Sequence, residues 1–151
     1  MRILLSEVFN SQSIILNLEN RTKEAVFAEL AEMITAACPE CDSEIMLSAL
    51  WEREKKMSTG ITSGVAVPHA LCRGINRMAG AIGISRKGID YDAPDHKPVH
   101  VVFMLAMSMP AEDNHLRILN QISRLSQSDA LPLILNAKNN QDVYAVLSRF
   151  H

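Results

Sequence analysis

The segment at residues 58–70 constrains this chain more than any other, because it passes from turn-forming to apolar residues and then meets a proline. Its first part, residues 58–64, is small, hydroxylated and glycine-rich, which predicts a turn. The run from Val65 to Val67 predicts a short buried strand. Pro68 predicts its end, since proline has a fixed φ and no N–H to give to a sheet. We therefore expect His69 to be held stiffly at the end of a strand, near the surface.

His69 in this position has two interpretations, an ordinary loop histidine or a group in a binding site. Gly60 and Gly64 favour the second, because glycine lets the backbone approach a ligand closely. Hydroxyl groups that would donate to an anion are also concentrated here, on Ser58, Thr59, Thr62 and Ser63. The alternative is that the two glycines form a plain turn before a strand.

The composition is ordinary for a globular protein and excludes two classes of function. The chain has 151 residues, of which 48% are hydrophobic and 21% charged, and this favours a single domain over residues 1–151. Its net charge of −2 lacks the basic surplus of a general nucleic-acid binder. No apolar run approaches the roughly 20 residues of a membrane span, and the N-terminus turns polar too soon for a secretory signal. We expect a cytoplasmic protein that neither binds nucleic acid nor inserts into a membrane.

The three cysteines, Cys38, Cys41 and Cys72, are a small, odd number that fits a reducing compartment. Cys38 and Cys41 have the two-residue spacing of redox and zinc motifs. A zinc site needs a second such pair or a close pair of histidines, and a thioredoxin-like unit needs a preceding strand. The sequence offers neither, so we interpret the segment as a break between two helices.

Apolar periodicity predicts helices that alternate with strands. The most apolar run, residues 98–107, predicts a central strand buried on both faces. Thr22 and either Asp42 or Ser43 are expected to cap two helices. The other expected elements are a helical turn at 3–9, strands at 13–18 and 78–84, helices at 22–37 and 42–56, a turn with a brief edge strand at 87–91, a loop at 92–95, a helix beginning near Pro110, and helices at 129–136 and 141–150, the last capped near Asn140. This order predicts an α/β sandwich with helices on both faces.

Two further residues point to a site around His69. His115 falls in the first turn of the helix after the central strand, where the crevice of such a sheet lies and helix N–H groups favour an anion. Arg53, from the end of an earlier helix, offers a guanidinium group to phosphate oxygens. Each of the two is otherwise an ordinary surface residue. The sequence contains no GxxxxGK[ST] loop, no GxGxxG opening a helix and no GxSxG elbow.

Taken together, these segments resemble the fructose/mannitol-type enzyme IIA (EIIA type 2) domain of the bacterial phosphoenolpyruvate-dependent sugar phosphotransferase system (PTS) and its nitrogen-regulatory paralogue. The similarity covers nearly the whole chain in the same order. The residues that carry it are Arg53-Glu54, 58–61, 64–69, 89–95, 98–99 with the strand that follows, and His115-Leu116 with an acidic lead-in at 112–113.

The resemblance implies a mixed central β-sheet with helices on both faces and a phosphoryl carrier at His69. In this family a histidine in this motif receives a phosphoryl group on Nε2 from the phosphohistidine of the carrier protein HPr and passes it to a cysteine of an enzyme IIB. His115 would then support the phosphorylated site and Arg53 would assist it. No metal, nucleotide or other cofactor is implied. Candidates for the loop around the phosphate are Ser58, Thr59, Gly60 and Gly64.

Thr62 departs from the family pattern, which has glycine or alanine at this place. A β-branched side chain disfavours a positive φ, so the loop geometry beside the site is expected to differ from that of other members.

Two alternatives remain open. The chain is either a sugar-transport component or a nitrogen-type regulator whose phosphorylation controls docking on other proteins. A zinc site is the weaker alternative, and its ligands would be His69, His96, His100 and His115. His100 lies inside the apolar strand, where a histidine is more often a satisfied core residue.

Overall fold

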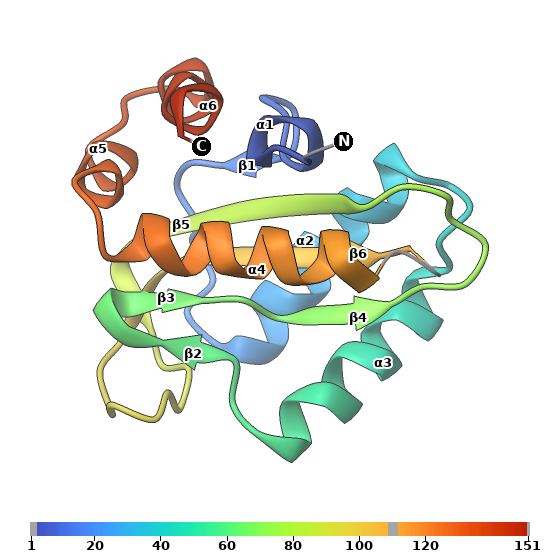
Figure 1. The fold of residues 1–151 in the computed structure, drawn as a ribbon. Helices are drawn as coiled ribbons and strands as arrows, with labels where there is room; N and C mark the ends of the chain where they lie inside the picture. The colour runs from blue at the N-terminus through green and yellow to red at the C-terminus, as the bar shows by residue number, and fades with distance from the viewer. Residues whose placement is uncertain (1–2, 109–111, 151) are drawn as a thin grey trace.

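The computed structural model describes residues 3–108 and 112–150, which form a six-stranded sheet with helices on both faces (Figure 1). The elements are α1 (Leu5–Val8), β1 (Ile14–Ile15), α2 (Lys23–Ala37), α3 (Ser43–Lys56), β2 (Gly60–Ile61), the 3-10 turn η1 (Thr62–Gly64), β3 (Val65–Ala66), β4 (His69–Leu71), β5 (Ala79–Ile89), β6 (Val99–Met107), α4 (Glu112–Ser126), α5 (Ala130–Leu135) and α6 (Asn140–Arg149). The strand order is β1-β5-β6-β3-β2, and β4 also pairs with β6. Strand β1 is parallel to β5, and β3 and β4 are parallel to β6, whereas β5 is antiparallel to β6 and β2 is antiparallel to β3.

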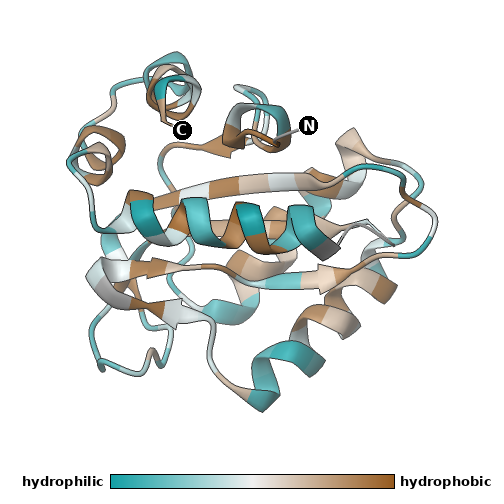
Figure 2. Ribbon diagram, in the orientation of Figure 1, coloured by the Kyte–Doolittle hydropathy of each residue, from teal (hydrophilic) through white to brown (hydrophobic). Residues whose placement is uncertain are grey.

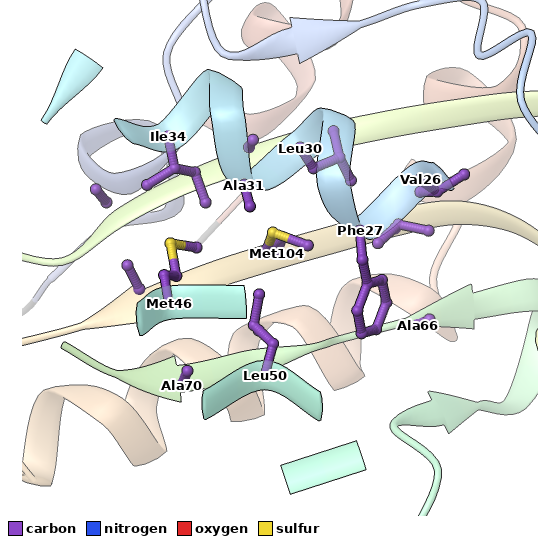
Figure 3. Packing of buried hydrophobic residues seen from close by; sticks show 14 of the residues in the cluster. Val26, Phe27, Leu30, Ala31, Ile34, Met46, Leu50, Ala66, Ala70 and Met104 are labelled. Carbon is purple, nitrogen blue, oxygen red and sulfur yellow. The ribbon is translucent and has the colours of Figure 1, made fainter. Parts of the chain in front are cut away.

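Strand β6 separates two hydrophobic cores, because consecutive side chains of a strand point to opposite faces. Val102 and Met104 pack against α2 and α3, and Figure 3 shows this core with Met104 among the side chains of both helices. Phe103 and Leu105 face the core under α1, α4, α5 and α6. All four side chains are 0% exposed. The strands are accordingly hydrophobic and the outward side of α4 is hydrophilic (Figure 2). The α/β class with a mixed sheet is thus confirmed.

Side-chain caps fix where three helices begin, as two of the sequence signals predict. Thr22 Oγ1 accepts from the Ala25 N–H at 3.2 Å, and Asp42 Oδ1 accepts from the Ile45 N–H at 3.1 Å. The last helix is capped by Asn139 instead of Asn140. The predicted start near Pro110 lies outside the described residues, and α4 is described from Glu112. Among the described residues, no helix has the length and apolar character needed to cross a membrane.

Two strands differ from the sequence prediction. Pro68 interrupts its strand but does not end it, because β4 resumes at His69 against the same partner, β6. The Pro68 carbonyl accepts from the Leu105 N–H at 3.0 Å, so hydrogen bonding to β6 continues across the interruption. Strand β5 continues through the predicted turn to Ile89, with a register shift and a left-handed Gly88 at φ 95°. The sequence predicts a stop at Pro68 and a turn at 87–91, whereas pairing with β6 extends the sheet through both places.

Candidate functional site

His69 is the first residue of β4 and pairs with Leu105 of β6. Its neighbour Ala70 is buried in the core under α2 and α3. Since strand side chains alternate, the His69 ring lies on the opposite face, the one that α4 covers. The ring is half-buried, so one part of it packs against the protein and another part reaches solvent.

A backbone hydrogen bond fixes the orientation and tautomer of the His69 ring. Its Nδ1 lies 2.7 Å from the carbonyl oxygen of Val67. A carbonyl oxygen only accepts, so Nδ1 carries the proton and donates it. In the neutral ring Nε2 therefore holds the free lone pair, which is the nucleophilic position of an imidazole.

The surroundings of His69 favour this neutral form. Burial lowers its pKa from the ordinary 6.5, and the positive charges of Arg53 and His115 lower it further. The Val67 carbonyl and the Glu54 carboxylate act in the opposite direction and raise the same pKa. The net effect is a lowered pKa, which keeps Nε2 unprotonated near neutral pH.

His115 lies in the first turns of α4, as the sequence predicts. Its Nε2 is 2.7 Å from the carbonyl oxygen of Ser108, the residue that follows β6. A carbonyl oxygen only accepts, so this bond assigns the proton to Nε2 and leaves Nδ1 without one in the neutral ring. Nδ1 would donate to an anion only when the ring carries a second proton. Because its charge acts on the pKa of His69, the two imidazoles share one electrostatic neighbourhood.

Arg53 lies in the last turn of α3, and its charge also acts on His69. Its Nη1 donates to the Met57 carbonyl at 2.9 Å, which ties the guanidinium to the end of its own helix. Among the described residues this is the one hydrogen bond that the group donates, so its other N–H groups are available to an anion. Arg53 and His115 thus lie close enough to His69 for their charges to lower its pKa.

The loop residues have more varied roles than the sequence suggests. Ser58 Oγ accepts from the Gly60 N–H at 3.2 Å. Gly60 is required for packing, because a Cβ there would lie 2.7 Å from Ala93 Cβ. The left-handed residues are Ser63, at φ 69°, and Gly64, at φ 75°. The side chain of Thr62 lies outside the described part of the chain, so the expectation about it stays a prediction.

Thr59 differs from the expectation that its hydroxyl faces an anion. Its side chain is 5% exposed and turned inward to Glu54, a buried carboxylate at the end of α3. Glu54 accepts from the Thr59 N–H at 2.8 Å and from its hydroxyl at 2.6 Å. Sequence reasoning missed this acid, because it stands in a charged run that resembles a solvated helix end. The available signal was its place beside Arg53 in the matching motif.

Cys38, Cys41, His96 and His100 have surroundings that differ from those of His69. Burial raises the pKa of Cys38 to about 11 and that of Cys41 to about 12, so both remain thiols, which are poor nucleophiles. His100 is half-buried and its Nδ1 donates to the Ser85 carbonyl at 2.9 Å. His96 is exposed in a loop. Within residues 3–108 and 112–150, no three His, Cys, Asp or Glu side chains are grouped as metal ligands.

Comparison with known proteins gives a consistent result for sequence and fold. The family model "Phosphoenolpyruvate-dependent sugar phosphotransferase system, EIIA 2" matches residues 7–150. A PTS fructose-specific EIIA component from Haloferax volcanii is 34% identical over 128 residues, covering 84% of this chain and 83% of that protein. A PTS fructose-specific EIIABC component from Bacillus subtilis is 31% identical over 146 residues, covering 96% of this chain but 23% of that longer protein. The crystal structure of nitrogen regulatory protein IIA-Ntr from Neisseria meningitidis has a TM-score of 0.86 at 28% identity, covering 95% of this chain and 98% of that one.

Proposed function

We propose that this chain, which belongs to the EIIA 2 family of the phosphoenolpyruvate-dependent sugar phosphotransferase system, carries its phosphoryl group on Nε2 of His69. EIIA proteins are phosphotransfer components, so the general role follows from membership. The proposal concerns the atom, the helping groups and the partners. The observation that carries it is the bond from Nδ1 of His69 to the Val67 carbonyl, because it frees Nε2 as the nucleophile.

The proposed transfer needs neither nucleotide nor metal. The Nε2 lone pair forms the new N–P bond while the N–P bond of the donor phosphohistidine breaks, and that electron pair returns to the donor ring. The charge left on the His69 ring is stabilised by the Val67 carbonyl, which accepts from Nδ1–H. The guanidinium of Arg53 and a doubly protonated His115 would stabilise the oxygens of the moving phosphoryl group. In the second transfer a cysteine thiolate attacks phosphorus and the electron pair returns to Nε2.

An apolar rim supports docking of protein partners around His69. Five large apolar side chains are mostly exposed among the described residues, and three of them lie beside site residues. These are Met57, whose carbonyl binds Arg53, Leu71, on the same face of β4 as His69, and Leu116, next to His115. Exposed apolar side chains of this kind suit a partner with its own exposed apolar side chains. We propose that HPr, or an HPr-like carrier, and an enzyme IIB bind here in turn.

Two similar proteins bear on the partner of the chain, and each supports a different candidate role. In the Bacillus subtilis relative the A, B and C parts form one component, which makes an adjacent B part the natural acceptor. The Neisseria meningitidis neighbour is a nitrogen regulatory protein. The second candidate is therefore a regulator that docks on other proteins according to its phosphorylation state. A cytoplasmic location belongs to both proposals and is supported by three free thiols.

Incubation with phosphoenolpyruvate, enzyme I and HPr tests the phosphorylated residue. We expect an acid-labile phosphate on the native chain and none on His69→Ala. The matched control is His96→Ala, which removes an exposed loop histidine and should be labelled at the native rate. Labelling of His69→Ala at the native rate would contradict the assignment. Addition of enzyme IIB then separates the two candidates, because only the sugar-transport component loses its label to the IIB cysteine.

A further inference from the structure

Glu54 is a buried acid that the phosphocarrier role does not by itself explain. It lies in the last turns of α3, beside Arg53, and is 7% exposed. Burying a carboxylate is costly unless it is paired and fully hydrogen-bonded. The residues that contact Glu54 therefore indicate its role.

Glu54 is neutralised by Lys23 and saturated with hydrogen bonds. Lys23 Nζ, from the first turn of α2, lies 2.8 Å from Glu54 Oε2 and 4.2 Å from the centre of the Tyr91 ring. The Tyr91 hydroxyl lies 2.7 Å from Thr59 Oγ1 and 3.4 Å from Glu54 Oε1. Burial raises the pKa of Glu54, but Lys23 and Thr59 outweigh it and hold the pKa below the ordinary 4.5. The carboxylate is therefore charged and held by four groups, which are the Lys23 ammonium, the Thr59 N–H, the Thr59 hydroxyl and the Tyr91 hydroxyl.

A continuous series of hydrogen bonds leads from this acid to the His69 ring. Glu54 accepts from the N–H and hydroxyl of Thr59, at 2.8 and 2.6 Å. The Thr59 carbonyl accepts from the Val67 N–H at 3.0 Å. The Val67 carbonyl accepts from His69 Nδ1 at 2.7 Å. Glu54 thus holds Thr59, Thr59 holds the backbone of Val67, and Val67 holds the ring of His69.

We infer that Glu54 is a positioning residue for phosphoryl transfer, which with Lys23 fixes Thr59 and, through Thr59 and Val67, the orientation of the His69 ring. This inference rests on the proposed carrier role of His69. Its physical reason is that phosphoryl transfer depends on an in-line approach of Nε2, and a small misplacement of the nucleophile has a large effect on rate. The hydrogen bonds of the acid go to Thr59 and Tyr91 and not to the His69 ring, so its effect on the position of the ring is indirect.

Glu54 also has an electrostatic signature that a purely structural residue lacks. The charged and titratable groups that act on His69 are Arg53 and Glu54 from α3 and His115 from α4. Glu54 is the one among them that raises the pKa of His69. Removing its charge in a folded protein should therefore lower the pKa of His69 further.

Three substitutions test the inference against a matched control. Glu54→Gln removes the charge at constant shape, Thr59→Val removes the hydroxyl, and Thr59→Ser keeps it. The control is Glu52→Gln, an exposed position two residues away that causes the same change in net charge. For each protein we would measure kcat and KM with phospho-HPr as donor, the pKa of His69 by NMR, and the thermal unfolding midpoint.

We expect Glu54→Gln to lower kcat about 10-fold or more with little change in KM, and to lower the pKa of His69. Thr59→Val should also lower kcat, whereas Thr59→Ser and Glu52→Gln should have a kcat close to the native value. If Glu54→Gln does not fold, Thr59→Val against Thr59→Ser decides the question, because both keep the buried ion pair.

Two outcomes would overturn the inference. One is a folded Glu54→Gln protein whose kcat and His69 pKa match the native values. The other is equal activity of Thr59→Val and Thr59→Ser. In both cases native labelling of His69 would leave the carrier role intact. If the native chain takes no label, the carrier role fails first, and the inference about its positioning residue fails with it.

Discussion

Nδ1 of His69 lies 2.7 Å from the carbonyl oxygen of Val67, two residues earlier in the same chain. Pro68 between them makes this contact possible, because it interrupts the strand without ending it. The Val67 N–H is held by Thr59, so its carbonyl is presented by a fixed peptide segment. The ring is thus oriented by its own strand, and Nε2 is directed away from it.

The pH dependence of phosphoryl acceptance should report the lowered pKa of His69. Because burial lowers this pKa below 6.5, the reactive neutral form persists below that pH. We expect the acceptance rate to be constant above 6.5 and to fall only as the pH drops through the lowered pKa. The unfolded chain binds this proton first, so the stability tied to the neutral ring is also lost as pH falls below 6.5. Rapid-quench kinetics measures the acceptance rate as a function of pH, and an NMR titration measures the pKa of His69. A titration midpoint of His69 above 6.5 would contradict this prediction.

Replacement of Arg53 should change both the rate of phosphoryl acceptance and the pKa of His69. We expect Arg53→Gln to slow phosphoryl acceptance about 10-fold to 100-fold, because a positive charge near the moving oxygens is lost. The same change should raise the pKa of His69, since Arg53 is one of the groups that lower it. The matched control is Lys55→Gln, an exposed cation on the same helix. Arg53 would have no part in the reaction if the two variants behaved alike in both measurements.

The apolar rim should control partner affinity without affecting the fold. Leu71 and Leu116 are 53% and 63% exposed, so a charge at either position is tolerated by the folded chain. We expect Leu71→Glu and Leu116→Glu to raise KM for phospho-HPr about 10-fold or more at an unchanged unfolding midpoint. Leu133→Glu is the control, because Leu133 is 60% exposed on α5 and does not neighbour a site residue. An equal rise in KM for all three variants would show that the added negative charge, and not the loss of an apolar docking contact, weakens binding of phospho-HPr.

Gly60 should be intolerant of a side chain for reasons of packing. A Cβ at this position would lie 2.7 Å from Ala93 Cβ and 3.2 Å from Ala93 Cα. We expect Gly60→Ala to lower the free energy of unfolding by about 1–3 kcal/mol, measured by denaturant titration. The second substitution Ala93→Gly should recover part of this loss. No recovery in the double variant would show that the cost comes from the backbone of residue 60.

Local sequence signals were sufficient to predict much of this fold. The apolar run that became β6 and the caps at Thr22 and Asp42 needed no distant partner to be recognised. The prediction of His69 as a site residue came in the same way, from the order of turn, apolar run and proline. The order of elements then gave the two-faced α/β architecture.

What sequence reasoning missed depends on contacts between distant segments. Pro68 was read as the end of a strand, but pairing with β6 restarts the ladder at His69. The sequence did not single out Glu54 as a buried acid, because its partner Lys23 lies on another helix. Thr59 was expected to face the site, and the same buried acid turns it inward. No local pattern encodes these three results.

The central claim, that Nε2 of His69 carries the phosphoryl group, is tested most directly by long-range ¹H–¹⁵N NMR of the ¹⁵N-labelled chain before and after phosphorylation. We predict that Nε2 of His69 acquires a coupling to ³¹P and that the ring nitrogens of the other four histidines show none. A phosphorus coupling at Nδ1 of His69, or at any other histidine, would contradict it.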